Sequence, residues 1–187
     1  CLVRCHVSTF TEVFGLDLAI TVLIINFFAE KREQQRYKRD LIFRMGSQVN
    51  SEAIRAIEEL RRHGWLQNGT LRNAHLENAR LKNAPLTEAD LAGAFLNDAD
   101  LREAELAGAN LKGADLTGAE LDGANLMAAI LTKANLRGAH LQGACIIFAN
   151  LEGAQLDHAI LPDGKRWHPG YDMSIFTNPP GDDASDG

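Results

Sequence analysis

Leucine recurs at every fifth position through the middle of the chain. It occupies position 66 and each fifth position up to 161, and Ile146 is the one replacement among these 20 sites. Alanine precedes these sites by two residues at all 18 positions from Ala74 to Ala159. A repeat this regular shows that one small structural unit is used many times, so it constrains the fold more than any other feature of the sequence.

A period of five fits neither an α-helix nor a β-strand. Along a helix, every fifth residue drifts by about 140° from the one before, so the leucines cannot form a stripe. Along a strand, every fifth residue alternates between the two faces. Eight of the 16 glycines stand two places after a repeat leucine, where they permit a positive φ angle. We therefore expect a chain that turns a corner every five residues and points leucine and alanine inward on every side.

The repeat units also have a recognisable motif. Residues 88–126 read EADLAGAFLNDADLREAELAGANLKGADLTGAELDGANL. This run resembles the A(D/N)Lxx motif of the pentapeptide-repeat family, and the resemblance covers residues 65–161. It implies a mainly β fold, a right-handed quadrilateral β-helix with four repeats in each coil. Twenty repeats then give about five coils, which at about 4.8 Å per coil make a rod roughly 24 Å long. The wider chain resembles membrane-anchored bacterial members of the family.

An apolar segment lies near the start of the chain. Val13 to Ala29 is 17 residues long and contains one carboxylate, Asp17, and no cation. That length reaches the lower limit for a helix that spans a bilayer, about 17–25 residues. Cations directly after such a helix place the following chain in the cytoplasm. Five of them occur here: Lys31, Arg32, Arg36, Lys38 and Arg39. We expect a single-pass transmembrane helix over 13–29 in the bacterial inner (plasma) membrane, with the repeats in the cytoplasm.

Three other interpretations of this segment are possible, and each fits the residues less well. A buried helix of a soluble domain would carry a polar stripe, but the apolar character runs all round the segment. A secretory signal peptide has its basic residues before the apolar run, whereas here they follow it. An acylated Cys1, as in a lipoprotein, is a weaker alternative.

The segment between the apolar run and the repeats is expected to be helical. A charged stretch without Gly or Pro can continue the first helix to about Met45, and Gly46 then breaks it. A second helix is expected from an N-cap at Asn50 or Ser51 to Gly64. One apolar face of this helix would pack on the repeats, with Ala53, Ile54, Ile57 and Leu60. The predicted organisation is an N-terminal stub (1–12), the transmembrane helix (13–29), a basic helical stalk and capping helix (30–64), the repeats (65–161), and a C-terminal cap with a disordered tail (162–187).

No pattern in the chain indicates catalysis or a cofactor. The three cysteines form neither a disulfide framework nor a CxxC zinc motif. If residues 20 apart stack, then His75, His140 and His158 lie on different ladders, and no metal site is expected. Leucine and alanine fill the interior and leave no cleft in which a carboxyl pKa could be shifted. We expect a protein that is not an enzyme and has no cofactor.

One outward patch on the last two coils is apolar. Met127, Ile147 and Phe148 fall on the same side, and an exposed apolar cluster is a candidate surface for a protein partner. The alternative is that the C-terminal tail folds over the patch, since Trp167 and other large apolar residues of the tail also need cover. Because the open ends of solenoids require capping, the covered state is the expectation.

Two functions follow from these features. The first is a membrane-anchored, non-enzymatic protein-interaction or scaffold module, whose partner and oligomeric state the sequence does not identify and which does not bind nucleic acid. The alternative is an inhibitor or protector of a nucleic-acid enzyme such as gyrase, acting by imitation of duplex DNA. Seven cations and 12 carboxylates give the repeats a net charge of only −5 (7 minus 12), which favours the first function.

Overall fold

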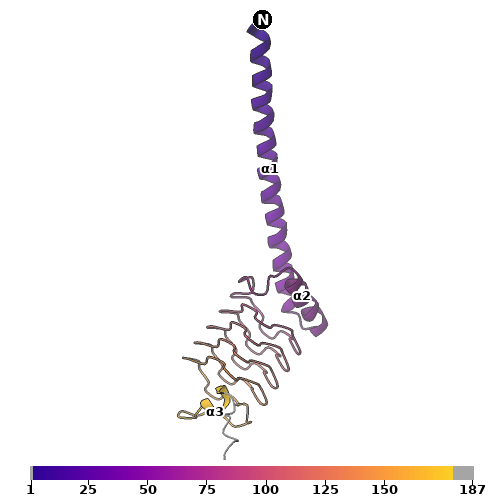
Figure 1. Ribbon diagram of the computed structural model, residues 1–187. Coiled ribbons are helices and arrows are strands. Elements are labelled where there is room, and N and C mark those ends of the chain that lie inside the picture. Colours follow the sequence, from indigo (N-terminus) through magenta and orange to yellow (C-terminus); the bar gives the residue numbers. More distant parts are fainter. Residues whose placement is uncertain (1, 179–187) are drawn as a thin grey trace, which may run out of the picture. The chain divides into compact units, whose positions relative to one another are not determined.

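The computed structural model describes the backbone of residues 2–178 and the side chains of residues 18–178. Three helices lie in this range: α1 (Leu2–Met45), α2 (Asn50–Arg62) and α3 (Ser174–Thr177). The chain divides into two compact units, Cys1–Arg39 and Asp40–Gly187. The repeats belong to the second unit, with α2 beside the first coils and α3 beside the last (Figure 1). The tail expected to be disordered lies mostly outside the described residues.

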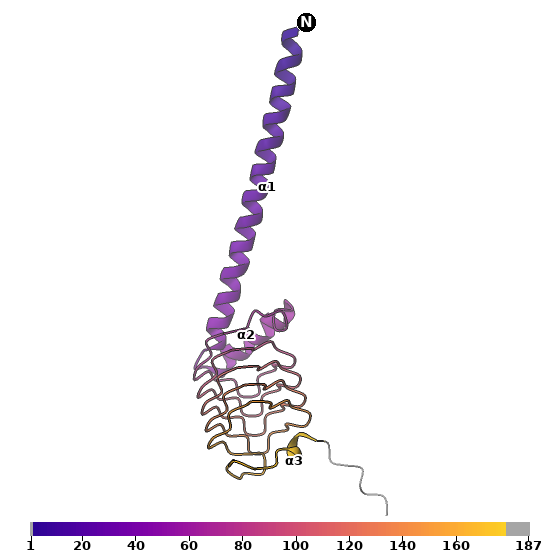
Figure 2. The ribbon, with the colours of Figure 1, turned by 90° about the vertical axis from the view of Figure 1, so that its left-hand side faces the viewer.

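Each coil of the solenoid contains 20 residues. Parallel β-bridges join positions 20 apart, from His75–Phe95 to His140–Ile160, so four repeats complete one coil (Figure 2). Among residues 2–178 these bridges are single and no extended strand forms. The mainly β fold that was expected is therefore present only as single parallel bridges between coils, and the expectation is wrong in that no extended strand forms among these residues. Each side of a coil is only five residues long, and turns leave room for one bridged residue.

Backbone hydrogen bonds run along the axis of the solenoid. The amide of Leu96 donates to the carbonyl of Asp115 in the next coil at 2.7 Å, and the amide of Phe95 donates to the carbonyl of Ala74 in the previous coil at 2.9 Å. The same pair of bonds recurs on each side of the inner coils. Coils therefore hold one another in register as neighbouring strands of a parallel sheet do.

The interior matches the predicted inward frame. Every repeat Leu and Ala from Leu76 to Ala139 has no exposed surface. Burial of each leucine is worth about 1.5–3 kcal/mol, so these positions hold most of the stabilising apolar area. The last coil is less complete, because Leu151 and Ala154 are only partly buried.

From Asn73 to His158, the corner two residues after each repeat Leu or Ile has a positive φ angle. Gly118 has φ 65°, and a Cβ atom built there would lie 2.5 Å from Oδ1 of Asp98 in the previous coil. Phe148 occupies the equivalent corner with φ 61°. The prediction that corners require this conformation is confirmed, and among the described positions Phe148 is the one Phe, Tyr or Trp that adopts it.

The N-terminal end of the solenoid is covered by helical residues. Leu41 and Met45 from the end of α1, and Ile57 and Leu60 from α2, are fully buried in the same core as the repeat leucines. The side chain of Asn50 donates to the carbonyl of Lys82 at 3.1 Å. These contacts hold α2 against the first coils of the solenoid.

The predicted N-cap of α2 is wrong. Val49 occupies that position and no side chain caps the helix. The amides of Glu52 and Ala53 both donate to the carbonyl of Val49. The amide of Val49 in turn donates a hydrogen bond to the hydroxyl oxygen of Ser47. The turn at Ser47 therefore sets the helix start before Asn50. The other end lies at Arg62 rather than Gly64.

The C-terminal end is covered by the tail. Trp167, Met173 and Phe176 pack against the core, and the amide of Trp167 donates to the carbonyl of Ala159 at 2.8 Å. Three polar groups fix the first loop of the tail. Asp163 accepts a hydrogen bond from the Tyr171 hydroxyl at 2.7 Å and pairs with Lys165 at 2.9 Å. These contacts hold the pKa of Asp163 down at about 2, with the Lys165 hydrogen bond as the largest cause.

The apolar part of α1 is exposed on all sides. Large side chains between residues 18 and 28 show 48–68% of their surface: Leu18, Ile20, Val22, Leu23, Ile24, Ile25, Phe27 and Phe28. The segment is helical as predicted, but within the described side chains no helix is both long and apolar enough to cross a membrane. Positions 13–17 of the predicted span lie outside those side chains.

Candidate interaction surfaces

The three residues of the predicted patch lie together on one side of the last two coils. Met127 and Ile147 are 20 positions apart, and the amide of Ala128 donates to the carbonyl of Ile147 at 2.8 Å. Met127 is 41% exposed, Ile147 is half-buried and Phe148 is 60% exposed. We call Met127, Ile147 and Phe148 the Phe148 cluster. The solenoid therefore brings together the residues that the period of 20 predicted to be neighbours.

Other apolar groups lie next to the cluster. Cys145 is half-buried and carries a free thiol, and it forms a bridge with Asn125 in the coil below. Ile130, three residues after Met127, is 41% exposed. On most other outward positions the side chains are polar or glycine. The Phe148 cluster thus stands out on the repeat surface by its chemistry.

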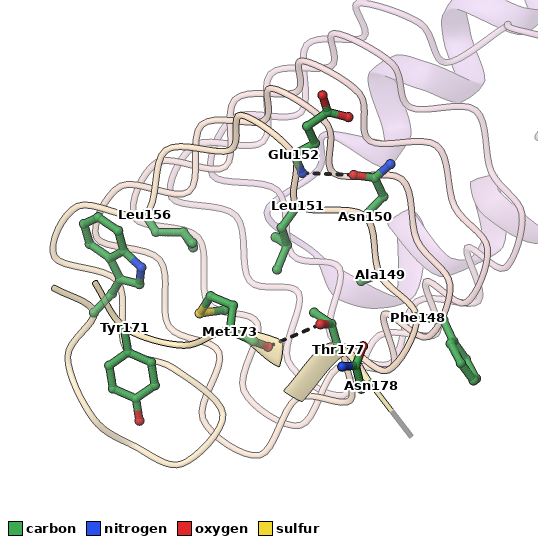
Figure 3. A pocket seen from close by; sticks show the side chains of 11 residues that line it. Phe148, Ala149, Asn150, Leu151, Glu152, Leu156, Tyr171, Met173, Thr177 and Asn178 are labelled. Atoms are coloured by element: carbon green, nitrogen blue, oxygen red, sulfur yellow. Dashed lines mark hydrogen bonds between the residues drawn. The ribbon is translucent and has the colours of Figure 1, made fainter. Parts of the chain in front are cut away.

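The tail caps the end of the solenoid but does not cover Phe148. Its described part packs through Met173 and Phe176 on the core, while the Phe148 ring points away from Met173 and Leu151 (Figure 3). The amide of Phe148 donates to the carbonyl of Thr177 at 2.6 Å, so the tail contacts the backbone at this corner. The expectation of a covered patch is therefore wrong for the tail up to Asn178.

An open depression lies between the last coil and the tail. Its volume is about 660 Å³, and its apolar floor includes Leu151, Leu156 and Met173 (Figure 3). Glu152 is the one acidic residue in its lining. A shallow apolar hollow with a single carboxylate has no pair of groups for acid–base catalysis. One sign of this site is visible in the repeat pattern, because the last repeat leucines have no further coil to cover them.

The side of the solenoid that carries Asp100 is a network of opposite charges. Arg102 forms two hydrogen bonds of 2.8 Å with the Asp100 carboxylate, and also pairs with Glu120 at 3.1 Å. The Arg102 hydrogen bonds lower the pKa of Asp100, and burial opposes them. Asp100 is almost fully buried, so these bonds satisfy a carboxylate that would otherwise lack solvation. Positions 20 apart on this side, Arg80, Asp100, Glu120 and His140, therefore form a ladder of mixed charge.

The histidines do not gather. No group of three or more potential metal ligands occurs among the described residues. His75 stacks on Phe95 with ring centroids 4.8 Å apart and forms a 2.9 Å contact with Glu77. That hydrogen bond lowers the pKa of Glu77. These contacts are local to one side of the first coils.

The basic residues predicted to flank a membrane lie on α1. Lys31, Arg32, Arg36 and Arg39 are exposed, and Lys38 is half-buried. The first four line one shallow hollow of about 390 Å³ along the helix, together with Phe28 and Gln35. They therefore share one side of the helix, directly after the exposed apolar segment.

The repeat region matches a known sequence family. Eight copies of the pentapeptide repeat are found, over residues 66–98, 85–122, 96–132 and 119–161. Together these ranges span 66–161, just over half of the 187 residues. The chain belongs to the pentapeptide-repeat family. Among curated proteins, none matches this pentapeptide-repeat protein.

Solved structures of pentapeptide-repeat proteins are similar to this one. HetL, which is involved in heterocyst differentiation regulation in Nostoc sp. strain PCC 7120, is 34% identical with a TM-score of 0.29, over 52% of this chain and 61% of HetL. The protein alr5209 from Nostoc PCC 7120 is 32% identical with a TM-score of 0.30, over 65% of this chain and 90% of its own. QnrB1, a plasmid-mediated fluoroquinolone resistance protein, is 19% identical with a TM-score of 0.27, over 48% of this chain and 66% of QnrB1. The chain thus spans about three-fifths of HetL.

Proposed function

We propose that this pentapeptide-repeat protein is a membrane-anchored, non-enzymatic protein-interaction or scaffold module. The solenoid holds the Phe148 cluster in a fixed position, where it serves as the docking point for a protein partner. The observation that carries the proposal is the Phe148 ring, which is 60% exposed at a corner with a positive φ angle.

An aromatic residue at this corner is unfavourable for folding alone. A left-handed backbone conformation costs an L-residue roughly 1–2 kcal/mol, and eight equivalent corners of the repeats use glycine instead. The exposed ring recovers only part of its possible burial. Large aromatic side chains on a rigid frame are typical of the residues that dominate binding energy at protein interfaces. A role in binding explains why phenylalanine stands at this corner, whereas the conformation of the turn does not.

The interior of the solenoid supports a non-enzymatic role. Leu and Ala fill it without exposed surface from Leu76 to Ala139, so a substrate has no access to the inside of these coils. The carboxylate of Asp100 is paired with Arg102 and serves the charge network. The large depression of the last coil is open and mainly apolar. Each of these features suits a rigid display surface.

The exposed apolar side chains of α1 support the membrane anchor. All sides of the helix between Leu18 and Phe28 present large apolar groups, and water is an unfavourable solvent for so much contiguous apolar surface. In the sequence the apolar run extends back to Val13. A lipid environment covers such a helix on all sides, and its flanking cations favour a cytoplasmic solenoid.

Imitation of duplex DNA is less well supported as a function. An imitation of the phosphate backbone needs a continuous negative surface, whereas Arg80, Lys82 and Arg102 interrupt the carboxylates on one side of the first coils. The mixed charge of this surface therefore favours the interaction module.

Site-specific photo-crosslinking tests the docking point. A photoreactive phenylalanine analogue at position 148 of the full chain should capture one discrete partner in cells of the source organism. The matched control places the same group at Thr117, which lies outward on the opposite side of the solenoid. Equal adducts from both positions, or none from either, would contradict docking through the Phe148 cluster.

Fractionation tests the anchor separately. The full chain should remain with the membrane pellet after extraction with alkaline carbonate, and a reporter fused to its C-terminal end should be active only as a cytoplasmic reporter. Recovery in the soluble fraction would contradict the anchor and leave the docking test unaffected.

A further inference from the structure

Charged residues are segregated around α1 directly after its apolar segment. At about 100° per residue, Lys31, Arg32, Arg36 and Arg39 fall within an arc of about 140° on the helix surface. The same projection places Glu30 and Glu33 outside that arc, on the other side of the helix. The shared hollow lined by the four cations agrees with this projection. We call Lys31, Arg32, Arg36 and Arg39 the cationic face.

The cationic face is not neutralised within its own unit. All four side chains are exposed, and among the described residues no ion pair joins any of them to a carboxylate. Some cations elsewhere in the chain are paired, as Arg44 is with Asp40 at 3.3 Å and Arg137 with Asp157 at 3.1 Å. The four positive charges of the cationic face therefore face solvent together, without carboxylate partners of this kind.

The cationic face begins within one helical turn of the exposed apolar side chains. Lys31 and Arg32 lie about 4.5–6 Å along the axis from Phe28, which matches the head-group zone of one leaflet, about 5–8 Å thick. Arg36 and Arg39 lie about 12–16 Å from Phe28. Side chains of a helix tilt toward its N-terminus, so these long cations lean back toward the apolar segment. All four charges are then within about a Debye length of the head groups, 8–10 Å.

We propose that the cationic face is a binding site for the phosphate groups of anionic phospholipids. The inference rests on the proposed membrane anchor and adds to it the lipid class that surrounds the helix. Phe28 at the boundary packs on acyl chains, and the four cations contact the negative head groups. Cations near a membrane surface attract anionic lipid by about 1 kcal/mol each, so a single lipid that contacts one or two of them is favoured about fivefold or more.

The test measures lipid selectivity of the full chain in vesicles. The chain is reconstituted in phosphatidylcholine vesicles with trace spin-labelled phosphatidylglycerol or spin-labelled phosphatidylcholine, and the motionally restricted fraction of each label is compared. Phosphatidylglycerol should be preferred about fivefold at low salt, and the preference should fall toward one in about 1 M salt, where the Debye length is about 3 Å.

Two variants separate a cationic face from net charge. Replacement of all four cations by glutamine should abolish the preference. The matched control exchanges neighbours (Glu30→Lys with Lys31→Glu, and Arg32→Glu with Glu33→Arg), which keeps the composition but divides the face. This control should lose most of the preference at unchanged net charge.

The outcomes distinguish the lipid site from the anchor. Retention in vesicles with equal immobilisation of both labels overturns the lipid site and leaves the anchor in place. A preference that the exchange variant retains in full also overturns it, since net charge alone would then suffice. A chain that floats with neither neutral nor anionic vesicles overturns both proposals. Salt-sensitive binding to anionic vesicles alone overturns the anchor and supports the lipid site.

Discussion

The backbone amide of Phe148 donates a hydrogen bond of 2.6 Å to the carbonyl oxygen of Thr177. In the inner coils the equivalent corner amide donates to the carbonyl 19 positions later, as Ala128 does to Ile147. For Phe148 that position would be Trp167, which lies outside the repeat register because its amide donates to the carbonyl of Ala159. Thr177, ten residues further along (177 minus 167), takes its place. The tail therefore completes the edge of the last coil with a residue from outside the repeat register.

Removal of residues 173–187 should open this edge. The Phe148 amide loses its acceptor and the core loses the cover of Met173 and Phe176. We expect amide hydrogen exchange at Phe148 to accelerate at least tenfold, whereas the amide of Ala128 in the coil below stays protected. Amide-resolved exchange by NMR measures both. Unchanged protection at Phe148 would mean that Thr177 does not hold the last coil.

Phe148→Gly should leave the fold intact. Glycine relieves the left-handed strain of an L-residue, roughly 1–2 kcal/mol, and forfeits the partial burial of the ring, which is of similar size. The free energy of unfolding should stay within about 1 kcal/mol of the parent, while crosslinking or co-purification of the docked partner is lost. A large loss of stability would show that the ring serves packing, which is the opposite of the proposed role.

Leu131→Asp should disrupt the central coils. Leu131 is fully buried, and an unpaired carboxylate in its place adds a desolvation cost to the lost apolar burial, together about 4 kcal/mol or more. The neighbouring Thr132 points outward between Lys112 and Glu152 in the ladder, so Thr132→Asp should change stability by about 0.5 kcal/mol or less. Thermal unfolding followed by circular dichroism measures both variants. Similar melting temperatures would contradict the inward frame of the repeats.

The stability that Asp163 contributes through Lys165 and Tyr171 should depend on pH. The folded pKa of Asp163 is lowered from 3.8 to about 2, so its ionised form stabilises the fold above pH 4. That contribution decreases as the pH falls below the ordinary pKa and is lost as the pH falls through about 2. The stability difference between the parent and Asp163→Asn should therefore shrink between pH 5 and pH 2. Denaturant titration at several pH values measures it, and a difference that is constant with pH would contradict the lowered pKa.

The repeats could be predicted because each residue's environment is set by its position modulo five and modulo 20. Leu116 and Ala119 share their surroundings with every other repeat Leu and Ala, so one geometric solution applies to all of them. The stacking of Met127 below Ile147 followed from the same arithmetic. The left-handed corners followed from where glycine recurs.

The ends of the solenoid could not be predicted in the same way, because their contacts do not repeat. The start of α2 depends on a turn at Ser47 that only the packing against the first coil selects. The path of the tail depends on which exposed edge of the last coil Thr177 reaches. The apolar character of Trp167 and Phe176 predicted that they would be covered. It did not predict whether they would pack on the end of the solenoid or on its side. The family resemblance implied a mainly β fold, but it did not state that each side would carry only a single bridged residue.

Because bridges join residues 20 apart, the position of a residue in the sequence determines both its coil and its side of the solenoid. Insertion of a whole coil would move the Phe148 cluster about 4.8 Å further from α2 and leave it facing the same direction. Insertion of a single five-residue unit before Met127 would instead carry the cluster onto the adjacent side, a quarter turn around the axis. The direction in which a docking surface faces around the solenoid axis is therefore set by the number of repeats that precede it. It does not depend on which residues form the surface.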